Sequence, residues 1–152
     1  MNAYIWYCLA CGAAILLVGC QDAVSLVVPN PDLALRKPHA AFAADAAKRQ
    51  YEAQAPRALD EDFRADYALM MRQVDLANIS DRDCSNVEVW INGQYVVFCP
   101  TFQGKTDKTL RFAMFYDHNG HAFDTDGGKN PIERLQVYRD GMMYDVVNHV
   151  AD

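Results

Sequence analysis

Residues 117–126, DHNGHAFDTD, bring oxygen and nitrogen ligands close together and are the first candidate for chemistry. Calcium loops space oxygen ligands at alternate positions around a glycine turn, and this stretch offers such donors. They are Asp117, Asn119, His121, Asp124 and Asp126. The stretch lacks the distal Glu of a calcium loop, and Asx residues beside Gly are ordinary turn formers. We therefore expect turns and no metal or other cofactor, with these residues as weak candidates for a cation site.

An aromatic pair is the second candidate, and it lies on the hairpin that NVEVWING and QYVVFCPTF predict around Asn92-Gly93. A two-residue loop sets Trp90 opposite Tyr95, beside Glu88, on the solvent side. The residues expected to face the core are then Val87, Val89, Ile91, Val96 and Phe98. Cross-strand aromatic pairs stabilise a hairpin, and exposed ones also bind a partner protein or a glycan. Both interpretations of the pair stay open.

Catalytic machinery is hard to assemble from this sequence. The three serines, Ser25, Ser80 and Ser85, do not lie in the Gly-x-Ser-x-Gly turn of hydrolases. The HExxH motif, the phosphate-binding loop and the Gly-rich dinucleotide turn are also missing. We therefore expect a protein that is not an enzyme, and a hydrolase with an unrecognised site is the enzymatic alternative.

Cys20 follows residues 3–19, which contain no charged side chain. A membrane-spanning helix needs about 20 apolar residues, whereas signal-peptide cores are shorter and end in small residues. Leu17-Val18-Gly19-Cys20 resembles the bacterial lipobox, in which the Cys thiol receives a diacylglycerol, although residues 1–7 contain no Lys or Arg. We expect residues 1–19 to be a lipoprotein signal peptide and Cys20 to be lipidated, with an uncleaved anchor helix as the alternative.

Cys84 and Cys99 are the cysteines that remain beyond the leader and Cys20. In an oxidising compartment an even pair suggests a disulfide. The predicted register places them diagonally on one face, about 7–8 Å apart, which exceeds the Cα separation of about 4.4–6.8 Å that suits a bridge. A bulge near Cys84 would bring them closer. A disulfide and two separate thiols both stay open.

The elements that position these residues are short strands. Val74, Leu76 and Asn78 share one face of a strand candidate, residues 108–117 alternate in polarity, and Asp140-Gly141 predicts a second hairpin. Six or seven short strands separated by turn signals describe a mainly β, antiparallel sandwich. We place this domain at residues 66–152, after a Pro- and Ala-rich tether at residues 20–65 in which residues 39–54 could form a short helix.

The stretches NISDRDCSNVEVWINGQYVVFCP and FAMFYDHNGHAF carry a resemblance. Over about residues 66–124 the chain resembles small uncharacterised bacterial envelope lipoproteins with an immunoglobulin-like sandwich. The resemblance implies an immunoglobulin-like fold and a cell-envelope location, and none of its motifs is catalytic.

Charge limits the partners of the chain. With 14 basic and 20 acidic residues, the formal net charge is −6, so the sequence lacks the basic footprint of a nucleic-acid binder. We expect a protein held on the membrane by its N-terminal lipid, with Gln21 favouring the outer membrane. Its role would be structural or an interaction with an envelope protein or a glycan. The alternatives are a cation- or glycan-binding module and an envelope hydrolase.

Overall fold

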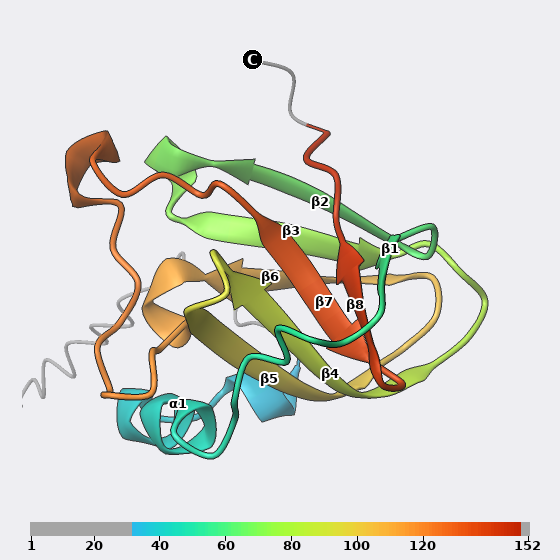
Figure 1. Cartoon of the computed structure of the whole chain (residues 1–152), viewed down its shortest axis with the longest axis horizontal. Helices are drawn as coiled ribbons and strands as arrows, with labels where there is room; N and C mark the ends of the chain where they lie inside the picture. The colour runs from blue at the N-terminus through green and yellow to red at the C-terminus, as the bar shows by residue number, and fades with distance from the viewer. Residues whose placement is uncertain (1–31, 150–152) are drawn as a thin grey trace, which may run out of the picture.

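Two β-sheets packed face to face form the fold of residues 32–149, the part of the chain that this computed structural model describes (Figure 1). The larger sheet has the strand order β1-β8-β7-β4-β5 and the smaller one β2-β3-β6. The strands are β1 (Arg57–Leu59), β2 (Phe63–Ala68), β3 (Gln73–Asn78), β4 (Cys84–Ile91), β5 (Tyr95–Phe102), β6 (Thr106–Arg111), β7 (Leu135–Arg139) and β8 (Met142–Asp145). The helices are α1 (His39–Ala46) and the 3-10 turns η1 (Leu33–Leu35), η2 (Leu69–Met71), η3 (Phe112–Met114) and η4 (Asp126–Gly128). The prediction of a mainly β sandwich is confirmed.

The strand order is that of an immunoglobulin-like fold. When β2, β3 and β6 are lettered A, B and E, the larger sheet reads G, F, C and C′ from β8 to β5. Strand β1 adds one more strand beside β8 and runs parallel to it, with Arg57 paired to Met143. The immunoglobulin-like sandwich therefore gains an edge strand from the segment that precedes it.

The core lies between the two sheets. Phe63 on the smaller sheet meets Phe102 on the larger one edge to face, with ring centroids 5.0 Å apart. Val74, Leu76 and Asn78 are all buried on one face of β3, as the sequence predicts. Burial of apolar side chains from both sheets in one contiguous cluster gives the sandwich its main stabilisation.

The first hairpin turns where predicted, but its register differs by one residue. Asn92 and Gly93 both have positive φ (55° and 65°), and the Gln94 N–H donates to the Ile91 carbonyl at 3.0 Å. The strands then pair Ile91 with Tyr95, which leaves Gln94 as an extra residue in the loop. A one-residue slip moves a whole strand face to the other side, so Val97 and Cys99, rather than Val96 and Phe98, share a face with Val87 and Val89. Val96 is nevertheless buried on its own face.

The later strands follow the sequence prediction more closely. The second hairpin turns at Asp140 and Gly141 as predicted, and Val137 pairs with Tyr144. The strand expected at residues 108–117 is shorter: β6 ends at Arg111, and the chain continues as the turn η3.

The segment before the sandwich is packed against it, which corrects the predicted tether for residues 32–65. Leu35, Phe42 and Ala46 are buried in the same cluster as the sheets. Helix α1 packs along β5 (Figure 1), and the predicted domain boundary at residue 66 falls inside β2. An isolated short helix is marginal in water, so burial of its apolar side chains on the sheet is what stabilises α1. Residues 20–31 of the predicted tether lie outside the described residues.

Candidate functional site

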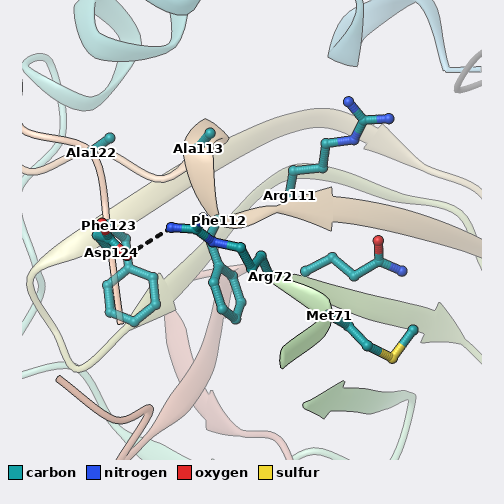
Figure 2. A pocket seen from close by; sticks show the side chains of 9 residues that line it. Met71, Arg72, Arg111, Phe112, Ala113, Ala122, Phe123 and Asp124 are labelled. Atoms are coloured by element: carbon teal, nitrogen blue, oxygen red, sulfur yellow. Dashed lines mark hydrogen bonds and ion pairs between the residues drawn. The ribbon is translucent and has the colours of Figure 1, made fainter. Parts of the chain in front are cut away.

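A groove of about 730 Å³ opens at the end of the smaller sheet where β6 leads into η3 (Figure 2). This volume lies within the range of about 300–1,000 Å³ of ligand pockets. The residues that line the groove are Met71, Arg72, Gln73, Arg111, Phe112, Ala113, Ala122, Phe123 and Asp124. The groove is thus lined by guanidinium groups, a methionine thioether and two aromatic rings.

The pairing of β3 with β6 positions the two arginines. Gln73 pairs with Arg111, so Arg72, the neighbour of Gln73, lies beside the end of β6. Arg72 has a φ of 54°, a left-handed conformation that costs a non-glycine residue of order 1 kcal/mol or more. The Arg72 carbonyl accepts the N–H of Phe112 at 2.9 Å, and this bond holds the strained backbone in place.

The floor of the groove is rigid because it belongs to the core. Phe112 and Phe123 are both buried and meet edge to face, with ring centroids 5.1 Å apart. Tyr95 also packs against Phe123, with ring centroids 5.2 Å apart, and the Phe123 N–H donates to the Phe115 carbonyl at 2.8 Å. The residues above this floor are therefore carried by fixed backbone.

The rim of the groove is charged and exposed. Arg72 Nη2 donates to Asp124 Oδ1 at 2.9 Å, and the two side chains are 68% and 62% exposed. Figure 2 shows this pair reaching across the groove, whereas Arg111 extends away from the Phe112 ring. Within residues 32–149, no ion pair or side-chain hydrogen bond engages Arg111, which is exposed. Met70 and Met71, in the turn η2, are 96% and 60% exposed.

Comparisons with family models, with curated proteins and with solved structures all return no match to this chain. The site is therefore interpreted from its own chemistry.

The predicted cation stretch is built as two turns. Asp117 Oδ1 accepts the backbone N–H groups of Asn119 (3.0 Å) and His121 (2.8 Å), and Asp117 Oδ2 lies 3.2 Å from His121 Nδ1. Burial by itself raises the pKa of Asp117, but these hydrogen bonds outweigh it and bring the pKa below its usual value. Asp124 points to Arg72 instead, and Asp126 lies 3.6 Å from Lys129. Among the described residues no three acidic, His or Cys side chains gather as metal ligands.

The predicted aromatic surface is not formed, because of the register slip. Trp90 pairs with Val96 rather than Tyr95, and it is only 3% exposed. Tyr51 covers it edge to face at 5.4 Å, and Tyr51 also donates to Gln136 at 2.7 Å. Tyr95 lies on the opposite face, against Phe123. The pair therefore gives no exposed surface for a glycan or a partner.

Glu88, the third residue of the predicted partner surface, is a partly buried anchor for the N-terminal segment. Trp90 Nε1 donates to Glu88 Oε2 at 3.0 Å, and Arg49 Nε lies 3.3 Å from Glu88 Oε1. Burial raises the pKa of Glu88, although Trp90 and Arg49 act in the opposite direction. The Arg49 guanidinium also stacks 3.7 Å from the centre of the Phe98 ring.

Cys84 and Cys99 are both free thiols in the structure, which corresponds to the second of the two alternatives, separate thiols. Cys99 pairs with Val87, whereas Cys84 pairs with Phe102. The two cysteines therefore lie in cross-strand pairs that are three residues apart along β4. Burial raises the pKa of Cys99 to about 12 and also raises that of Cys84, so neither thiol is activated as a nucleophile. Cys20 lies outside the described residues. Within residues 32–149, the structure contains no helix with the length and apolarity needed to span a membrane.

The groove was not predicted from the sequence, because its walls come from segments far apart in the chain. The signal that could have pointed to it is the stretch Leu69-Met70-Met71-Arg72. Two adjacent large apolar residues at a hairpin tip leave at least one of them exposed.

Proposed function

We propose that this protein is a non-catalytic interaction module that is held at the bacterial cell envelope by a lipid on Cys20 and binds an envelope protein through the groove. Leu17-Val18-Gly19-Cys20 supports the anchor. Because one acyl chain binds a membrane only marginally, two or three chains on Cys20 would give a stable attachment, and the outer membrane is the proposed location.

The observation that carries the interaction role is the kind of residue that lines the groove. Met, Arg and aromatic side chains are enriched at protein–protein interfaces, whereas Lys, Glu, Asp and Ala are depleted there. The groove has five residues of the enriched types, Met71, Arg72, Arg111, Phe112 and Phe123, against three of the depleted types, Ala113, Ala122 and Asp124. Met70 extends the apolar rim beyond it.

The anchor is tested on the intact protein. Wild type is expected to have the mass of residues 20–152 plus acyl chains, and Cys20→Ser is expected to accumulate as a precursor that retains residues 1–19. An unlipidated full-length wild type contradicts the anchor.

The partner surface is tested with a photo-crosslinking residue placed at position 70 of the lipidated chain in whole envelopes. Position 59 is the matched control, because Leu59 is 60% exposed on the edge strand β1. We expect a discrete protein adduct from position 70 and none of the same mass from position 59. Equal adducts from both positions, or none from position 70, contradict the proposed function.

A further inference from the structure

We propose that the groove recognises a carboxylate that lies beside an apolar side chain in an extended segment of the partner protein, and that Asp124 is a built-in competitor which this carboxylate displaces from Arg72. This inference rests on the proposed function and names the chemistry of its partner.

The charge of the groove matches a single carboxylate. The groove is lined by two guanidinium groups, on Arg72 and Arg111, and by one carboxylate, on Asp124, which pairs with Arg72. The nearby Asp126 lies 3.6 Å from Lys129 and adds no net charge. One positive charge remains, because no ion pair or side-chain hydrogen bond within residues 32–149 engages Arg111. A monoanionic carboxylate therefore completes the groove, since guanidinium and carboxylate form charge-assisted hydrogen bonds.

Breaking the Arg72–Asp124 ion pair to let another carboxylate bind Arg72 costs little free energy. Both side chains are mostly exposed, and exposed ion pairs contribute little. The loop keeps its shape without that pair: the Asp124 carbonyl accepts from Asn130 Nδ2 at 2.9 Å, and the Thr125 carbonyl accepts from the N–H groups of Gly128 and Asn130. An incoming carboxylate thus replaces the Asp124 side chain without unfolding the loop.

The apolar part of the groove fits a side chain next to that carboxylate. Met71, Ala113 and Ala122 line the groove together with the rings of Phe112 and Phe123. Methionine is flexible and polarisable, so it adapts to side chains of different shape. An open groove with these walls suits an extended segment that contributes one charge and one apolar side chain.

The experiment is a titration of the full chain in detergent micelles, followed through the backbone amide resonances of residues 71–73, 111–113 and 122–124. The carboxylate probe is N-acetylphenylalanine. Three compounds serve as matched controls. N-acetylphenylalaninamide lacks the charge, and acetate lacks the apolar group. Inorganic phosphate tests whether the groove binds anions in general. The variants are Arg111→Gln and Asp124→Asn. Their controls are Arg134→Gln and Asp107→Asn, which make the same charge changes at exposed positions outside the groove.

We expect N-acetylphenylalanine to bind at these amides at least tenfold more tightly than its amide, acetate or phosphate. Arg111→Gln should weaken this binding about tenfold, which is the order of a charge-assisted hydrogen bond. Asp124→Asn should tighten it at least threefold, because Arg72 is then free, and both control variants should leave it unchanged. The opposite signs of the two groove variants exclude a general effect of folding.

The proposal is overturned if N-acetylphenylalanine does not bind at these amides or if Asp124→Asn leaves its affinity unchanged or lower. It is also overturned if phosphate binds as tightly, which would make the groove a general anion site. An adduct from position 70 together with failure of the titration removes only the carboxylate chemistry. Success of the titration without that adduct contradicts the proposed function instead.

Discussion

Single side chains in this protein gain their importance from what they hold in place. Asp117 organises the turn that leads to the groove, and Asp60 binds Arg139, which is itself buried. Neither role is visible from residue type alone, since acidic residues beside Gly or in Pro-rich stretches are usually solvated.

Removing the charge of Asp117 should destabilise the protein at neutral pH. The folded-state pKa of Asp117 lies below its ordinary value, so its contribution is present above the unfolded-state pKa of about 3.9 and is lost as pH falls through the lower folded-state pKa. Asp117→Asn keeps an acceptor for the two amides but loses the charge. We expect a loss of about 1 kcal/mol in the free energy of unfolding at pH 7.

Urea unfolding of wild type and Asp117→Asn between pH 7 and pH 3 checks this prediction. The difference between the two proteins should shrink below about pH 4. Asp107→Asn, at an exposed site on β6, should show no such pH dependence. A difference that grows on acidification would contradict the assignment.

The Asp60–Arg139 pair is a buried clamp between the start of β2 and β7. Arg139 Nη2 donates to Asp60 Oδ1 at 2.9 Å, and that oxygen also accepts the N–H groups of Asp62 and Phe63. Asp60→Ala leaves the buried Arg139 with Asp62 Oδ2, at 3.2 Å, as its remaining carboxylate partner, and it removes the acceptor of two backbone N–H groups. We therefore expect a cost of about 3 kcal/mol, the lower end for breaking a buried ion pair. Arg82→Ala, which removes the mostly exposed partner of Asp62, should cost at most about 1 kcal/mol. Equal losses on urea unfolding would show that the clamp is not buried in solution.

At the scale of elements, the unexpected feature is that the N-terminal segment belongs to the sandwich. Helix α1 covers part of β5, and β1 extends the larger sheet beside β8. Phe42 is the clearest probe, because it is 3% exposed on a helix that was predicted to lie in a tether.

Phe42→Ala should destabilise the whole sandwich by about 3–5 kcal/mol, the usual cost of removing a buried aromatic side chain. Leu33→Ala, at a site that is 78% exposed, should change stability by less than about 0.5 kcal/mol. Thermal unfolding of the two variants measures the difference. A Phe42→Ala variant as stable as wild type would contradict the packing of this segment on the sandwich and would support the predicted tether.

The sequence predicted the elements better than their pairing. Asn92-Gly93 and Asp140-Gly141 are local signals for turns with positive φ, and both turns form. The register of the first hairpin also depends on whether Gln94 pairs, and nothing within the turn decides that. The packing of α1 and the presence of Arg72 and Arg111 in one groove could not be predicted, because both depend on contacts between segments distant in sequence.

At the scale of the whole molecule, local and global charge differ. The chain carries a net charge of −6, yet the groove is lined by two arginines and one aspartate. An acidic surface repels polyacidic partners at long range, so the groove is suited to a partner with an isolated carboxylate. The lipid proposed on Cys20 would keep the groove in the envelope, where such a partner is met at high local concentration.

The most direct test of this account is the yield of the position-70 crosslink in envelopes that carry Arg111→Glu, compared with Arg134→Glu. Both changes alter the net charge equally, but only Arg111 lines the groove. We predict that Arg111→Glu lowers the yield of the adduct at least tenfold, whereas Arg134→Glu leaves it unchanged. An adduct that persists in Arg111→Glu at the wild-type yield would contradict the claim that the partner binds through the groove.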